Sequence, residues 1–97
     1  MVLKKAKSEL DIALRHIRVM KAVMENQPIG IFKLSELVNM PKHKVRYSLR
    51  ILEQSGIIEP TQYGAVIRKD ADIGKLKEDL AEIKKVVEEI ERELEEL

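Results

Sequence analysis

The 97-residue sequence contains no cysteine and no long apolar run. The missing thiols exclude disulfide bonds and thiolate metal sites, and a reducing compartment is the simplest location for such a chain. No apolar stretch approaches the roughly 18 residues that a membrane span needs, and the start, MVLKKAKSEL, is too charged for a signal peptide. We therefore expect a soluble, cytoplasmic protein that does not bind membranes.

Groups that carry catalysis are also scarce. There are only two histidines, and the sequence has no glycine-rich phosphate loop, no nucleophile and base pair and no metal-ligand cluster. The glutamate pairs Glu88-Glu89 and Glu95-Glu96 are typical of a solvated helix face. We expect no enzymatic activity, no catalytic residue, no cofactor and no bound metal ion, and no residue set specifies a small-molecule ligand.

The net charge of +1 hides two regions of opposite sign. Residues 1–69 contain thirteen Lys or Arg against six Asp or Glu, whereas residues 70–97 contain five against eleven. This change of sign predicts a basic domain over residues 1–69 joined to an acidic helix over residues 70–97.

The stretch MPKHKVRYSLRILEQSG, residues 40–56, predicts a helix over about 41–55. Pro41 suits the first helical turn, and Gly56 can adopt the left-handed conformation that ends a helix. At about 100° per residue, one narrow stripe is apolar and should be buried; it comprises Val45, Leu49 and Leu52, with Ser48 beside it. The remaining sides are cationic, aromatic and rich in hydrogen-bond donors, with Lys42, His43, Lys44, Arg46, Tyr47 and Arg50.

This polar face has two interpretations. It suits the phosphate-lined major groove of DNA, but an ordinary solvated helix face also carries lysine and arginine. The neighbouring elements favour the first interpretation, because a short helix over about 33–39 precedes the cationic helix after a tight turn. Two short helices in this order form a helix-turn-helix pattern. In the first of them, Leu34, Leu37 and Val38 are expected to turn inward.

A longer helix is predicted at the start of the chain. It begins near Ser8, a good capping residue, and ends at Asn26-Gln27-Pro28. Its core-facing stripe is expected to consist of Leu10, Leu14, Ile17, Met20 and Met24. His16 lies off this stripe and is expected at the surface.

The β-rich segments are short. Residues 57–60 and 65–68 predict a hairpin joined by a turn at residues 61–64, which contains Gly64. Residues 29–31 have the character of a single edge rung, which would complete a three-stranded sheet.

The order helix, rung, helix, cationic helix and hairpin, with LSELVNMPKHKVRYSLRILEQSGII at its centre, resembles the winged helix-turn-helix transcriptional regulators, notably small archaeal ones. The resemblance covers roughly residues 8–69 and implies an α+β, mainly α fold that binds double-stranded DNA. It places one helix in the major groove and the hairpin, or wing, against the backbone or minor groove. The groove-facing positions correspond to Lys42, His43, Arg46, Tyr47 and Arg50, and the wing tip to Gln62 and Tyr63. This wing tip departs from the family in carrying no Arg or Lys.

Residues 70–97 predict one long helix, capped by Asp70 or Asp72. Its apolar residues follow an unbroken 3, 4 spacing, which is a heptad seam: Ile73, Leu76, Leu80, Ile83, Val87, Ile90, Leu94 and Leu97. Because the other faces are charged, the seam needs one partner helix. Self-association through a two-stranded coiled coil is the better explanation, and folding back onto the first helix of the same chain is the alternative.

An antiparallel pair of these helices is favoured. If two copies cross near residue 85, each seam residue meets an apolar partner, for example Leu80 and Ile90. The acidic end, residues 88–96, then lies near Lys75 and Lys77 of the other chain, whereas a parallel pair would bring two acidic ends together. We therefore predict a homodimeric, nucleoid-associated regulator that binds double-stranded DNA. The alternative is a protein-interaction winged-helix module of a transcription or chromatin assembly.

Overall fold

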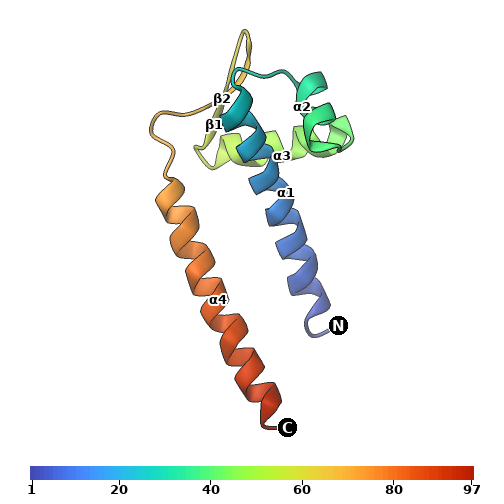
Figure 1. Ribbon diagram of the computed structural model, residues 1–97, viewed down its shortest axis with the longest axis vertical. Helices are drawn as coiled ribbons and strands as arrows, with labels where there is room; N and C mark the ends of the chain where they lie inside the picture. Colours follow the sequence, from blue (N-terminus) through green and yellow to red (C-terminus); the bar gives the residue numbers. More distant parts are fainter.

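The computed structural model describes residues 1–97 and is mainly helical (Figure 1). In chain order the elements are α1 (Lys4–Asn26), α2 (Ile31–Val38), α3 (Lys42–Gln54), β1 (Ile58–Thr61), β2 (Gly64–Ile67) and α4 (Ile73–Glu95). The two strands form a small antiparallel sheet, so the expected α+β, mainly α class is confirmed. Residues 15–69 contain every buried residue and form a body. Two arms, residues 1–14 and residues 77–97, project from it at the same end (Figure 1).

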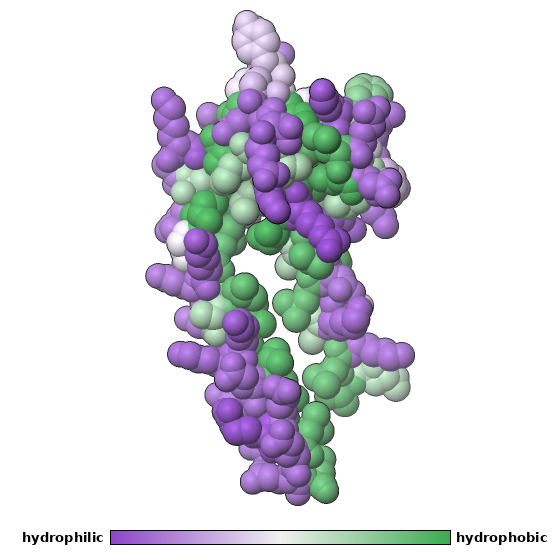
Figure 2. Space-filling model, viewed as in Figure 1, coloured by the Kyte–Doolittle hydropathy of each residue, from purple (hydrophilic) through white to green (hydrophobic).

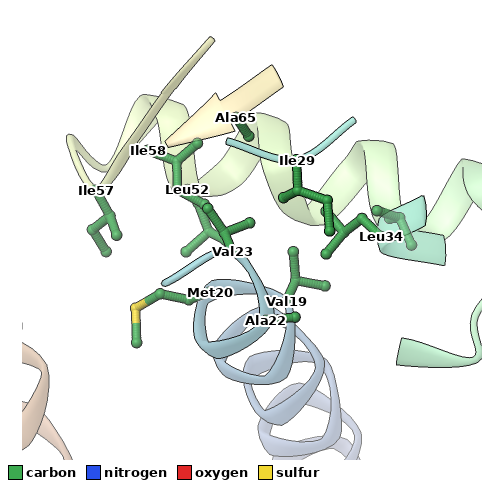
Figure 3. Close-up of a cluster of buried hydrophobic side chains, with 11 residues drawn as sticks. Val19, Met20, Ala22, Val23, Ile29, Leu34, Leu52, Ile57, Ile58 and Ala65 are labelled. Atoms are coloured by element: carbon green, nitrogen blue, oxygen red, sulfur yellow. The ribbon is translucent and has the colours of Figure 1, made fainter. Parts of the chain in front are cut away.

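The core of the body is small and contains no aromatic side chain. Its eleven buried apolar residues are Val19, Met20, Ala22, Val23, Ile29, Leu34, Val45, Leu52, Ile57, Ile58 and Ala65. In Figure 3, the side chains of α1 point toward those of α3, the hairpin and the segment before α2. Aromatic side chains usually supply large buried areas in a core. Because this core contains none, the aromatic residues of the chain lie at its surface, where they are available for binding.

α1 has two apolar sides, and the structure buries the less regular one. Val19, Ala22 and Val23 face the core. The expected core stripe is wrong apart from Met20, because Leu10, Leu14, Ile17 and Met24 are all between 40% and 46% exposed. Helical spacing identifies an apolar side but not what will cover it, and here the side with the longer repeat faces away from the body.

The boundaries of the first two helices also differ from those expected. α1 begins at Lys4 with no side-chain cap, so Ser8 lies inside the helix; residues 4–7 are good helix formers and extend it. α2 begins at Ile31 and ends before Asn39, which takes the left-handed conformation (φ 53°, ψ 50°). Within α2, Leu34 is buried and Val38 half-buried as expected, but Leu37 is half exposed, and its inward placement is wrong.

The hairpin pairs Ile58 with Ile67 and Thr61 with Gly64, close to the expected strands. The rung is a single bridge: the N–H of Ile29 donates to the Ala65 carbonyl at 3.2 Å, and the N–H of Ala65 donates back at 2.8 Å. The expected three-stranded sheet is therefore a two-stranded sheet with one added bridge, because α2 starts only two residues after Ile29.

α4 is anchored to the body only at its beginning. Asp72 caps it, with Oδ1 accepting from the Lys75 N–H at 3.0 Å. Ile73 and Leu76 pack against the core, but α4 contains no buried residue. The alternative in which α4 folds back onto α1 is therefore not observed, because Leu80 and most later seam residues stay exposed. No helix is long and apolar enough to cross a membrane.

Candidate nucleic-acid interface

α3 is held against the body by its apolar stripe. Val45, Ser48 and Leu52 are buried and Leu49 is half-buried, as the helical spacing predicts. Pro41 precedes the helix in an extended conformation, and Gly56 follows it with φ 74°, which confirms its role in ending the helix. The orientation of α3 is therefore set by residues 45–52, and its opposite side is left in solvent.

That exposed side carries cations without acidic partners. The exposed polar residues of α3 that the sequence predicts as DNA-binding are Lys42, His43, Lys44, Arg46 and Arg50. The three ion pairs of the protein lie elsewhere: Lys7 with Asp11, Arg68 with Asp70, and Lys75 with Asp79. One acid, Glu53, is exposed in the last turn of α3. The first two turns and a half of α3 thus present free positive charge to any approaching anion.

Tyr47 does not stand free beside these cations. Its ring centroid lies 5.7 Å from that of His16, and the Arg15 guanidinium carbon lies 5.9 Å from the Tyr47 centroid. Both partners belong to α1, so the Tyr47 ring packs between α1 and α3. Tyr47 nevertheless remains 44% exposed. Its phenol end can still contact a ligand, while its ring position is set by α1.

His16 also departs from its expected surface position. It is half-buried, and its Nδ1 is hydrogen-bonded to the Oγ of buried Ser48 at 2.7 Å. Burial, with a smaller contribution from the positive charge of Arg15, lowers the pKa of His16 below its ordinary value. Helical spacing could not reveal this contact, because it joins residues 32 positions apart. The neutral imidazole therefore links α1 to the cationic helix.

Phe32 is an exposed residue outside the predicted site. It lies in the first turn of α2, is 68% exposed, and has the Nζ of Lys42 at 4.2 Å from its ring centroid. The sequence contained a usable signal, because Phe32 is the only phenylalanine and falls outside the inward side of α2 marked by Leu34. Its contact brings the starts of α2 and α3 into one surface.

The hairpin tip places the remaining predicted DNA-binding residues, Gln62 and Tyr63, in solvent. Tyr63 is 74% exposed, and the hairpin reaches away from the two arms (Figure 1). The Thr61 hydroxyl donates to the Gly64 carbonyl at 2.7 Å and accepts from the Tyr63 N–H at 3.1 Å, so the turn is internally braced. All three aromatic residues of the chain, Phe32, Tyr47 and Tyr63, are thus exposed.

A second cationic feature adjoins the start of α3. An open cavity of about 520 Å³ lies between α1 and the turn from α2 to α3, and its walls include Arg15, Arg18, Lys44 and Asp11. Asp11 is paired with Lys7, and the Arg15 Nε is buried without a hydrogen-bond partner. The cavity is therefore net positive, and it extends the charge of α3 onto α1. Neither arginine was among the predicted site residues.

The chain matches no protein-family model and no curated protein. No group of three or more His, Cys, Asp or Glu side chains is arranged to hold a metal ion. The surface is cationic and aromatic, and its residues lie on α1, α2, α3 and the hairpin.

Proposed function

We propose that this protein is a homodimeric DNA-binding regulator of the winged helix-turn-helix type. The observation that carries the proposal is the exposed side of α3, where Arg46 and Arg50 have no acidic partner in the chain. In helix-turn-helix proteins the second helix lies in the major groove, where arginine can donate two hydrogen bonds to guanine. In this proposal α2 and α3 form the motif, and β1 and β2 form the wing.

The roles of the individual residues follow from their positions. Arg46, Arg50 and His43 would contact bases, while Lys42 and Lys44, in the first turn of α3, would contact phosphates. The phenol of Tyr47 would reach the edge of the groove from its position against α1. The wing tip would add contacts from Gln62 and Tyr63 that do not depend on charge, since no cation lies there.

The second part of the proposal concerns the exposed seam of α4. Leu80, Ile83, Val87, Leu94 and Leu97 are between 40% and 97% exposed, and a two-stranded coiled coil of two α4 helices would bury them. The seam from Ile73 to Leu97 spans about 36 Å at 1.5 Å per residue. One turn of DNA spans roughly 34 to 36 Å, so an antiparallel coil would separate two bodies by a distance suited to successive major grooves.

The test is binding to a random 30-base-pair duplex, measured by fluorescence anisotropy from about 50 to 200 mM salt. Phosphate contacts make the affinity fall steeply with salt, by about 10³-fold or more over this range if six or more phosphates are neutralised. We expect Arg46→Ala/Arg50→Ala to weaken binding strongly. Lys85→Ala/Arg92→Ala removes the same charge from the outer side of α4 and should bind like the wild type.

Two results would contradict the proposal. Equal affinity of both double variants would show that the side of α3 is not the interface. A folded wild type that does not bind duplex at the lowest salt would favour the alternative function, a protein-interaction module that assembles through α4. For that function the exposed Phe32 would be the first contact to examine.

A further inference from the structure

α1 carries a second heptad seam, and it is the side of the helix that the body leaves uncovered. Its residues follow the 3, 4 spacing without a break: Leu3, Ala6, Leu10, Ala13, Ile17, Met20 and Met24. Leu3, Leu10, Ile17 and Met24 are between 40% and 49% exposed, and only Met20 reaches the core. The side of a helix that faces solvent is usually polar. Three consecutive apolar heptads are therefore unexpected on a side that stays in solvent. An uncovered apolar repeat of this kind is typical of a helix that packs against another helix.

Beyond the body, the seams of α1 and α4 face each other without touching. In Figure 2 the hydrophobic sides of the two arms face the space between them, and that space is open in the space-filling view. The separation is set near the body, where Ile73 and Leu76 of α4 pack against the core that includes Met20 of α1. Beyond that point α4 also extends past the start of α1 (Figure 1). Neither arm therefore covers the seam of the other within one chain.

We propose that the α4 helix of a second copy packs, antiparallel to α4, in the space between α1 and α4. By two-fold symmetry each chain would fill the space of the other, giving a bundle of four helices at the dimer interface. This inference rests on the proposed homodimer and adds α1 to an interface otherwise formed by α4 alone.

The charges favour a second copy as the occupant. The end of α4, residues 88–96, contains six glutamates and one arginine. In the antiparallel arrangement this end reaches α1 close to the body, where Arg18 and Lys21 are exposed and residues 15–21 contain no acid. Opposite charges beside a seam select partner and orientation in coiled coils. The acidic end thus finds cations both on α4 and on α1 of its partner.

The side chains of the α1 seam also suit a close approach. Ala6 and Ala13 alternate with Leu3, Leu10 and Ile17, so two of its layers leave room for the larger Ile83 and Ile90 of the partner. Small side chains facing large ones let two helices interdigitate. With α4 pairs crossing near residue 85, Ala13 would lie near Ile90 of the other copy.

The absence of cysteine makes this arrangement directly testable. We would prepare full-length Ala13→Cys and Ile90→Cys separately, mix them, oxidise the mixture and separate the products under denaturing conditions. We expect a disulfide-linked heterodimer, and no such product from Ala13→Cys mixed with Leu80→Cys. A link only in the mixture with Leu80→Cys would overturn the antiparallel arrangement. A double variant Ala13→Cys/Ile90→Cys that closes only within one chain would overturn the exchange of helices.

A second experiment separates this inference from the proposed homodimer. The dimer dissociation constant would be measured by sedimentation equilibrium for Leu10→Glu, with Ser8→Glu as the control on the opposite side of α1. We expect Leu10→Glu to raise the constant about tenfold or more and Ser8→Glu to leave it unchanged, with helix content retained in both. If Ile83→Glu dissociates the dimer but Leu10→Glu does not, α1 is outside the interface. If the wild type is monomeric throughout, the homodimer itself is wrong.

Discussion

The body and the arms use similar apolar residues in opposite ways. In the body, Val19, Val23, Leu34 and Val45 have no exposed surface. In the arms, every leucine and valine is 40% or more exposed. α1 contains both situations within one helix. The contrast shows that a regular apolar stripe does not by itself determine whether the same chain covers it.

The largest expected effect comes from breaking the core of the body. Leu34→Ala should lower the free energy of unfolding by about 2 to 5 kcal/mol, because it leaves a cavity in a fully buried site. Leu80→Ala in the α4 arm should change it by less than about 1 kcal/mol when measured on the monomer. Urea denaturation followed by circular dichroism would compare the two. Equal losses would mean that the arm is already packed within one chain.

A smaller effect is expected where the hairpin joins the body. A Cβ on Gly64, whose φ is 126°, would lie 2.5 to 2.8 Å from backbone atoms of Ile29. Gly64→Ala should therefore disrupt the bridge and cost about 3 kcal/mol. Gly30→Ala is the matched control, because a Cβ there meets nothing within 4 Å, and it should cost no more than about 1 kcal/mol. Thermal unfolding of both variants is the measurement, and similar melting temperatures would contradict the close approach.

The smallest effect concerns the contact between α1 and α3. The pKa of His16 is lowered below 6.5 in the folded protein, by burial first and by Arg15 second. The unfolded chain then binds the proton more readily, so stability is complete above about pH 6.5 and declines as the pH falls toward the folded pKa. We expect the melting temperature to fall between pH 7.5 and 5.5, and His16→Gln to reduce that fall.

His43→Gln is the control for this pH effect. His43 is exposed on α3 and lacks a contact such as the hydrogen bond between His16 and Ser48. The His43→Gln variant should therefore show the same fall in melting temperature between pH 7.5 and 5.5 as the wild type. A wild-type difference that persists unchanged in His16→Gln would assign the pH dependence to other groups.

Several features of the fold could be predicted from the sequence. The cationic helix, its buried side at Val45, Ser48 and Leu52, and its end at Gly56 all follow from local pattern and backbone preference. The hairpin around Gly64 and the helix cap at Asp72 also follow from local sequence pattern. Each depends on residues close together in the chain, so each is encoded within a short window.

The candidate site could be predicted only in part. The cations of α3 are visible in the sequence because helical spacing places them opposite the apolar stripe. The packing of Tyr47 against His16 and Arg15, and the contact of Phe32 with Lys42, join different helices. No local pattern specifies which residues two helices bring together, so these contacts could not be derived.

The sequence alone determined where helices form, which sides of them are apolar and where opposite charges gather, since these depend on local spacing and composition. Only the tertiary structure decided which apolar side became the core. On α1 it buried Val19 and Val23 against α2, α3 and the hairpin and left the longer heptad repeat in solvent. The reason is geometric: the short elements that follow α1 cover one side of its second half and do not reach the opposite side.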